Sequence, residues 1–233
     1  FFCFLINSIR NFLIPTAIIL TYHRISIDAD DPHKLTVSPD NFYKQLTYLK
    51  SKFHIIHLSE LYDCLKNKKL RKNTMVITFD DGYADNFYYG LPILRELNIP
   101  ATIFITSGLL DGENFYWDKN KSSKYCRPLS SFELKKLIDQ KLITIGGHTL
   151  SHQHLPLLDN NQKSIEILED RNKLATICNK EINFFAYPFG DYDKQSMKLV
   201  EDAGYNCGFI LENRRVSIFC KNMYKLPRFI VRN

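Results

Sequence analysis

Short apolar runs alternate with amphipathic segments along almost the whole of this chain. Runs such as residues 17–21 and 75–77 are rich in β-branched side chains, which is typical of buried strands. Between such runs apolar residues recur every three or four positions, as at Phe42, Leu46 and Leu49, which predicts a helix. Strands that alternate with helices indicate parallel strands joined by helical crossovers. The pattern therefore predicts an α/β fold.

Local signals place the remaining elements. Ser38 before Pro39 is typical of a helix start, and Ser130 with Glu133 makes a capping box. Further strands are expected at residues 53–58, 100–106, 142–145, 182–186, 207–211 and 224–231, and further helices after Ser59, after Gly82, near Asp159 and through Met197. Residues 107–127 are expected to form an inserted loop. No repeat or linker divides residues 16–233, so we expect a single domain there.

Two adjacent carboxylates mark the end of the central predicted strand. Asp80 and Asp81 are followed by Gly82, which lets the backbone turn at no steric cost. Adjacent acids at a strand end face different directions, so one can hold a metal while the other serves as a base. The alternative is a polar turn that caps the next helix. Asp85 and Asn86 can likewise line a cleft or cap that helix.

Polar side chains follow four predicted strands at their carboxyl ends. They are Tyr22-His23, Asp80-Asp81, the pair His148 and His152, and Tyr187-Pro188. In a β/α barrel these strand ends share one face, on which active sites form. The sequence therefore predicts a barrel with its chemistry gathered on that face.

The two histidines complete a set of metal ligands. His148 and His152 are four positions apart, so on a helical turn both imidazoles would project from one side. Two His and one Asp suit a divalent ion and leave positions open for water and substrate. We expect Asp81, His148 and His152 to hold one divalent metal, with Zn preferred over Co, Ni, Fe or Mn.

These residues predict metal-assisted hydrolysis of an amide or ester. A bound metal would lower the pKa of its water toward neutrality. Asp80 would take the water proton as general base, and His23 would protonate the leaving nitrogen as general acid.

Composition narrows the class of partner. The net charge is +6, and the Lys residues are spread without a dense basic run, so a nucleic-acid partner is not expected. A preference for anionic lipid or phosphate stays open. The six Cys residues include no Cys-x-x-Cys pair, which argues against a zinc ribbon or a disulfide framework and favours a reducing compartment.

Residues 1–15 form an apolar amino-terminal segment. The segment is too short and too interrupted for a membrane span, and it lacks the cleavage site of a signal peptide. A helix on a membrane surface is the functional interpretation, and a helix packed against the domain is the slightly favoured alternative. We expect a cytoplasmic location, or one peripheral to the inner membrane, rather than export.

Three motifs resemble those of a known family. They are Thr-Phe-Asp-Asp-Gly at 78–82, His-Thr-Leu-Ser-His at 148–152 and Tyr-Pro-Phe-Gly at 187–190. In order and spacing they are similar to the first three motifs of the polysaccharide deacetylases, the NodB-homology enzymes of carbohydrate esterase family 4. The resemblance extends over about residues 18–228.

The resemblance implies a distorted (β/α) barrel that removes acetyl groups from N-acetylated sugars. It implies the roles reached above for Asp80 as base and for Asp81, His148 and His152 on the metal. It also implies that the backbone N–H of Tyr187 lies in the oxyanion site.

Two positions depart from the family pattern. Many members carry an Arg that steadies the catalytic Asp where this chain has Ala186, and Arg24 and Arg228 are candidates to replace it. The late Leu-x-His motif is absent, since the tail reads Lys-Leu-Pro-Arg at 225–228. The chain is similar in this to the exopolysaccharide N-deacetylase branch, in which an amino-terminal Tyr-His motif, here Tyr22-His23, supplies the acid.

Substrate contacts are expected from Tyr83, Trp117, Pro188 and Phe189. Trp117, with Tyr116, can either stack on a sugar ring or anchor the inserted loop to the domain. The leading hypothesis is a metal-dependent N-deacetylase acting on a surface polysaccharide or a lipid-linked glycan. The alternatives are an O-acetyl esterase of the same fold and a glycan-binding scaffold that has lost catalysis.

Overall fold

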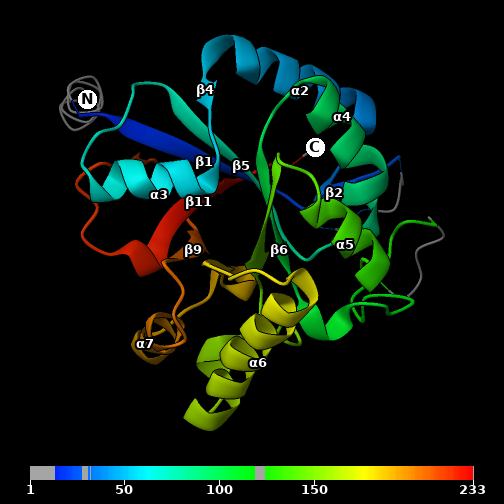
Figure 1. The fold of residues 1–233 in the computed structure, drawn as a ribbon, viewed down its shortest axis with the longest axis vertical. Coiled ribbons are helices and arrows are strands. Elements are labelled where there is room, and N and C mark those ends of the chain that lie inside the picture. The colour runs from blue at the N-terminus through cyan, green and yellow to red at the C-terminus, as the bar shows by residue number, and fades with distance from the viewer. Residues whose placement is uncertain (1–13, 28–30, 32, 119–123, 233) are drawn as a thin grey trace.

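The computed structural model describes residues 14–27, 31, 33–118 and 124–232. Within this part, parallel strands pair side by side until the last meets the first, and Figure 1 shows these strands at the centre of the molecule. In order around the ring they are β1 (Thr16–Tyr22), β5 (Thr74–Phe79), β6 (Ala101–Ile105), β7 (Ile143–Gly147), β8 (Phe184–Ala186), β9 (Cys207–Leu211) and β11 (Leu226–Ile230). Because β1 pairs with both β5 and β11, the sheet closes. The expected distorted (β/α) barrel in a single domain is confirmed.

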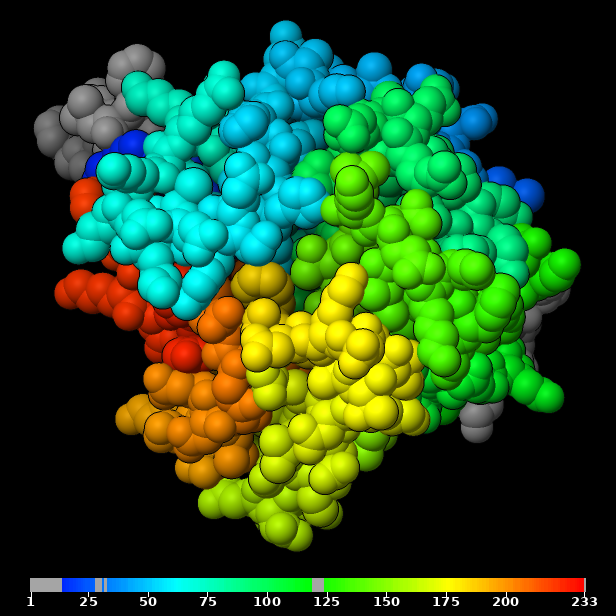
Figure 2. Space-filling view, in the orientation of Figure 1, coloured from blue at the N-terminus to red at the C-terminus, as the bar shows by residue number. Residues whose placement is uncertain are grey.

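Short strands at the rim distort the barrel. β4 (His54–Ile55) runs parallel to β5, and β10 (Val216–Ser217), which the sequence did not indicate, pairs antiparallel with the start of β1. A separate two-stranded sheet joins β2 (Arg24–Ile25) to β3 (Thr36–Val37). The first and last strands of the ring, β1 and β11, pair with each other, and Figure 2 shows blue and red segments near each other at one edge.

Helices surround the barrel (Figure 1). They are α2 (Pro39–Lys52), α3 (Leu58–Lys66), α4 (Leu91–Glu96), α5 (Ser131–Ile138), α6 (Asn160–Cys178) and α7 (Lys194–Asp202). The predicted caps Ser38 and Ser130 are confirmed, since each accepts a hydrogen bond from the first turn of its helix. Asp159, near which a helix start was predicted, caps α6 in the same way. No helix in the described ranges is long and apolar enough to cross a membrane.

Two helix starts differ from the prediction. α3 begins at Leu58, before Ser59, and its flanking residue His57 makes no capping hydrogen bond through its side chain. A π-helical segment (Asn86–Gly90) precedes α4, where the sequence predicts one continuous helix. Pro92 lies at the start of α4, and its missing N–H prevents the regular hydrogen-bond pattern from running through this point.

The core has two layers, divided by the alternation of side chains along each strand. Val76, Phe104 and Phe209 belong to a buried cluster built mainly from alternating positions of the barrel strands. Their neighbours, such as Ile77 and Ile105, join a larger cluster with the apolar residues of the surrounding helices. The packed interior keeps the strand ends in fixed positions, and the site is built on those ends.

Candidate active site

A cavity of about 370 Å³ opens at the carboxyl ends of the barrel strands. His23, which follows β1, lies in its lining together with Asp80 and Asp81, which follow β5, and with His148 and His152, which follow β7. All five side chains are buried. The structure thus brings together the five residues to which the sequence assigns hydrolytic chemistry.

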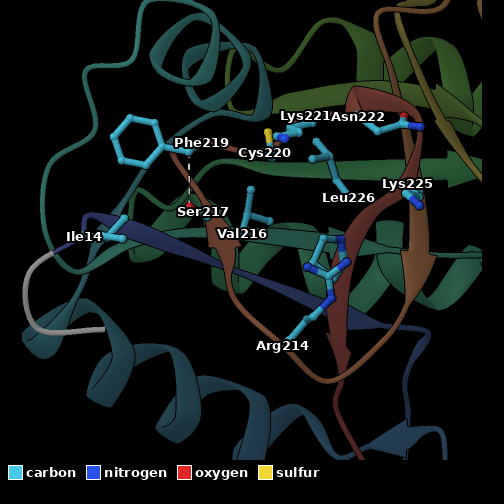
Figure 3. Close-up of a pocket in the computed structure, with 11 residues that line it drawn as sticks. Ile14, Arg214, Val216, Ser217, Phe219, Cys220, Lys221, Asn222, Lys225 and Leu226 are labelled. Carbon is cyan, nitrogen blue, oxygen red and sulfur yellow. Dashed lines mark hydrogen bonds between the residues drawn. The ribbon is translucent and has the colours of Figure 1, made fainter. Parts of the chain in front are cut away.

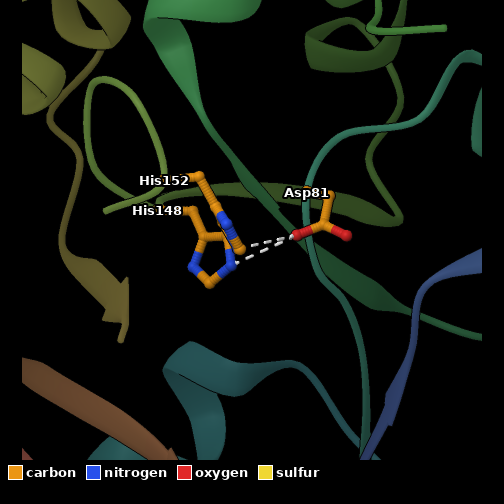
Figure 4. Close-up of side chains that lie close together, drawn as sticks. All are labelled: Asp81, His148 and His152. Atoms are coloured by element: carbon orange, nitrogen blue, oxygen red, sulfur yellow. Dashed lines mark ion pairs between the residues drawn. The ribbon is translucent and has the colours of Figure 1, made fainter. Parts of the chain in front are cut away.

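Asp81, His148 and His152 form a metal-binding constellation (Figure 4). One carboxylate oxygen of Asp81 lies 3.4 Å from Nε2 of His148 and 3.3 Å from Nε2 of His152. His148 Nδ1 lies 2.7 Å from the carbonyl oxygen of Ala186, a contact that orients Nε2 toward the other ligands. One carboxylate and two imidazoles are a donor set suited to zinc with open positions, so the residues fit a divalent ion.

The backbone between the histidines is not helical, and the predicted helical turn is wrong. Thr149 and His152 have positive φ values of 68° and 59°, which bend the chain back on itself. His152 N–H donates to Thr149 Oγ1 at 2.9 Å, and Leu150 N–H donates to the carbonyl oxygen of Glu166 in α6 at 3.0 Å. The two imidazoles therefore converge because a turn, hydrogen-bonded to α6, lies between them.

Arg228 holds Asp80, the candidate general base. Its two terminal nitrogens lie 2.7 Å from the two carboxylate oxygens of Asp80, and both side chains are fully enclosed. Such a two-pronged pair fixes the plane of the carboxylate. Many family members carry an Arg on the strand that corresponds to β8, where this chain has Ala186. Here Arg228 on β11 contacts Asp80 in place of that Arg. Arg24, the other candidate, instead pairs with Asp85 at 3.3 Å.

The charges in the cavity set the protonation of its groups. Burial alone would raise the pKa of Asp80, but Arg228 and nearby imidazoles outweigh it and hold that pKa below its usual value. Burial acts on Asp81 too, yet hydrogen bonds from His148 and His152 bring its pKa well below the ordinary range. Burial lowers the pKa of His23, against the pull of Asp81 and Asp80. Both carboxylates are therefore held in the ionised form that a ligand and a base require.

The segment that carries His23 is anchored by Asp85 and Asn86. Asn86 donates to the His23 carbonyl oxygen at 2.9 Å. Asp85 accepts from the backbone N–H of Ile25 at 3.2 Å and pairs with Arg24. Both carboxamide and carboxylate are buried, so these residues neither line the cavity nor cap a helix through their side chains. Asp85 and Asn86 therefore position His23, the candidate general acid, through contacts to its backbone segment.

Aromatic side chains line one part of the cavity. Trp117, Tyr116 and Phe189 are among its lining residues, as predicted for Trp117 and Phe189. The rings of Trp117 and Phe189 each lie 4.6 Å from the ring of His152, measured between centroids. Trp117 also donates through Nε1 to the Tyr83 hydroxyl at 2.8 Å. The same indole thus borders the cavity and anchors its loop.

The two other predicted substrate contacts lie outside the cavity lining. Tyr83 is buried, and its hydroxyl donates to Asp118 at 2.5 Å, which ties the loop to the barrel. Pro188 is also buried and is absent from the lining. Both residues follow strand ends, but their side chains pack inward. The alternation of side chains along a strand does not predict which way a residue beyond its end will face.

The Tyr187 N–H is already engaged. It donates to the carbonyl oxygen of Phe209 at 3.0 Å, because β8 continues its parallel pairing with β9 past Ala186. The geometry therefore does not support the predicted oxyanion role for this N–H.

Sequence reasoning missed a second set of lining residues. His33 and Leu35 come from the loop before β3, while Leu211, Ile230 and Arg232 come from the ends of β9 and β11. No motif marks these positions, and only the closure of the barrel, which aligns Thr21 with Ile230, brings the chain end to the cavity.

Comparison with known proteins agrees with this geometry. A family model described as polysaccharide deacetylase matches residues 67–208, which include Asp80, Asp81 and both histidines. The chain belongs to the polysaccharide deacetylase family. YxkH of Bacillus subtilis (strain 168) is 28% identical over 163 residues, a match that covers 70% of this chain and 53% of that protein.

A second relative matches over more of its length. The poly-beta-1,6-N-acetyl-D-glucosamine N-deacetylase of Staphylococcus aureus (strain MRSA252) is 28% identical over 241 residues, covering 93% of this chain and 79% of that protein.

Two solved structures share the fold. The Streptococcus pyogenes deacetylase PplD superposes with a TM-score of 0.79 at 22% identity, covering 94% of this chain and 93% of that one. IcaB from Ammonifex degensii superposes with a TM-score of 0.79 at 20% identity, covering 93% of this chain and 92% of that one. The likeness confirms the barrel fold of this chain.

Proposed function

We propose that this protein is a divalent-metal-dependent hydrolase that removes acetyl groups from N-acetylated sugars of a surface polysaccharide or a lipid-linked glycan. The observation that carries the proposal is a cavity lined by two adjacent buried carboxylates in different environments. Asp81 faces two imidazoles, and Asp80 is gripped by Arg228. One carboxylate is thereby suited to a metal and the other to proton transfer.

Asp81, His148 and His152 would hold the metal. A bound divalent ion, most simply zinc, supplies an acidified water and polarises the acyl oxygen. Asp80, fixed by Arg228 and kept ionised, accepts the proton of the attacking water. His23, in the same cavity and anchored through Asn86, donates a proton to the leaving nitrogen.

Two further observations support a sugar substrate. Trp117, Tyr116 and Phe189 give the cavity a partly aromatic wall, which suits the apolar face of a sugar ring. The relative from Staphylococcus aureus is named as an N-deacetylase of poly-beta-1,6-N-acetyl-D-glucosamine, which points to the amide of an N-acetyl sugar.

Acetate release tests this proposal. Zinc-loaded protein is incubated with N-acetylglucosamine oligomers and, separately, with O-acetylated xylan, beside Asp80→Asn as a matched variant. We expect acetate from the N-acetyl oligomers and a loss of at least about a hundredfold in the variant. Release from the O-acetyl glycan alone would favour the esterase. Metal binding with no release from either would favour a glycan-binding scaffold.

A further inference from the structure

A second cavity lies at the opposite end of the barrel from the catalytic cavity. It has a volume of about 320 Å³ and lies beside β10 and the start of β11. β10 pairs with Thr16, the first residue of β1, whereas His23 follows the last residue of that strand. Because the strand has seven residues, the two cavities are about 20 Å apart along β1.

The lining of this second cavity is basic. It includes Arg214, Lys221 and Lys225 and contains no acidic residue. One nitrogen of Arg214, Nε, forms an ion pair with Glu212 Oε1 at 2.7 Å. Figure 3 shows Lys221, Lys225 and Arg214 on three different sides of the cavity. The side chains thus surround a space of positive potential.

A neighbouring loop adds more positive charge to the same end. Residues 66–72, which run from the last residue of α3 toward β5, include five basic residues and no acidic one, and all five basic side chains are exposed. β5 lies along one edge of β1 and β10 along the other, so this loop and the second cavity flank the start of β1. The two groups of cations, at residues 66–72 and 214–225, are far apart in the sequence and lie at the same end of the barrel only in the fold.

Apolar side chains border these cations. Phe219 is 59% exposed at the rim of the cavity, on the same side as Ile14 (Figure 3). In the sequence, Ile14 is preceded by an apolar segment. An exposed aromatic ring beside lysines is the combination found where proteins meet a bilayer interface. A ligand made of phosphate groups alone would bind the cations and would make no favourable contact with Phe219.

We propose that this amino-terminal end of the barrel, defined by residues 66–72, Ile14 and 214–225, docks on a bilayer that carries anionic phospholipids. Its cations face the headgroups, and Phe219 enters the interface between headgroups and acyl chains. The catalytic cavity then points away from the bilayer. Resting on the proposed function, this orientation favours a polymer segment beyond the headgroup layer as substrate, over a sugar joined directly to lipid.

Vesicle binding tests the docking without any substrate. The full chain is mixed with phosphatidylglycerol-containing vesicles and with pure phosphatidylcholine vesicles. We expect binding to the anionic vesicles only, and binding at least about tenfold weaker for the double variant Lys221→Glu/Lys225→Glu, because each basic residue near an anionic surface contributes about 1 kcal/mol. Lys135→Glu/Lys173→Glu, with the same charge change on the exposed faces of α5 and α6, should bind like wild type.

The only tryptophan of the chain reports the orientation. Trp117 lies in the catalytic cavity, so brominated acyl chains should leave its fluorescence unquenched in bound protein. The variant Phe219→Trp should gain a signal that these lipids quench. Quenched Trp117, an unquenched Trp at position 219, equal binding of the double variant, or binding to soluble polyphosphate but not to vesicles would each overturn the proposal. Acetate release is measured separately, so failure of docking leaves the hydrolase untouched.

Discussion

Arg228 illustrates how a single residue can restore a missing part of a motif. It lies 148 positions from Asp80 in the sequence, yet both terminal nitrogens reach the carboxylate at 2.7 Å. The guanidinium also donates to Thr78 Oγ1 at 3.3 Å, a further contact that fixes its position at the end of β5. A charge held at two points costs little reorganisation when the base accepts a proton.

Replacing Arg228 by Ala should therefore make Asp80 a less effective general base and leave the metal ligands in place. With the guanidinium gone, burial dominates and the pKa of Asp80 rises, so the acid limb of the pH profile of kcat/KM moves to higher pH. We expect acetate release to fall about a hundredfold, with metal content unchanged.

The same variant should lose stability, measured by urea unfolding, by about 3 kcal/mol, because a buried charge is left alone. In the wild type Asp80 has a lowered pKa when folded, so its contribution is present above the unfolded pKa and is lost as pH falls through the folded one. Arg228→Lys keeps the charge but not the two-point contact, so it should recover stability better than rate. An unshifted acid limb in Arg228→Ala would contradict the argument.

At the scale of elements, the metal ligands depend on turns packed against one another. Gly108 donates its N–H to the carbonyl oxygen of Leu150 at 2.8 Å, and a methyl group at Gly108 would lie 2.1 Å from that oxygen. Leu150 lies between His148 and His152 in the turn that makes both imidazoles converge. The close approach of two loops thus fixes the spacing of the ligands.

Gly108→Ala should displace this turn and weaken the metal site. We expect a loss of at least about tenfold in zinc affinity, measured by competition with a chelating dye, and a stability cost of about 1–3 kcal/mol. Gly90→Ala is the matched control, because a methyl group there meets only Ile25 at 3.8 Å. The control should keep zinc affinity, and equal affinity in both variants would count against this role of Gly108.

The Arg24–Asp85 pair should behave as a unit that secures the segment after β1. Asp85→Ala leaves Arg24 buried without this partner and frees the Ile25 N–H, so we expect about 3 kcal/mol of destabilisation. Faster hydrogen exchange at residues 23–26 should accompany it, which mass spectrometry can measure. The double variant Arg24→Met/Asp85→Leu should regain much of the stability. A double variant less stable than Asp85→Ala would contradict this.

At the scale of the whole molecule, the candidate metal site joins distant parts of the barrel. Asp81 follows β5, and both histidines follow β7, so a bound ion would crosslink strands that reach it from separate parts of the chain. Binding to the folded state alone stabilises it by mass action, by about 2.7 kcal/mol when free metal is a hundred times Kd.

Chelation should therefore lower the melting temperature, by about 5–10 °C for a chain of this length. Readdition of zinc should restore it, while His148→Ala should melt at one temperature with or without zinc. Scanning calorimetry makes the measurement. A wild type that is indifferent to both chelator and zinc would contradict the assigned ligands.

The sequence by itself determined the fold class, the barrel face on which the candidate site lies, and the residues proposed as metal ligands and base. These follow from information that is local in the chain. Strand and helix periods need only a few residues, and Asp80, Asp81, His148 and His152 stand directly after strands whose ends must share a face. Parallel packing alone then brings them together.

Only the tertiary structure decided the contacts that depend on closure of the barrel and on the path of its loops. It selected Arg228 over Arg24 beside Asp80, turned Tyr83 inward, and engaged the Tyr187 N–H with Phe209. It also gathered the basic residues around the start of β1. Each of these outcomes rests on positions far apart in sequence, where local propensity carries no information about which side chains will meet.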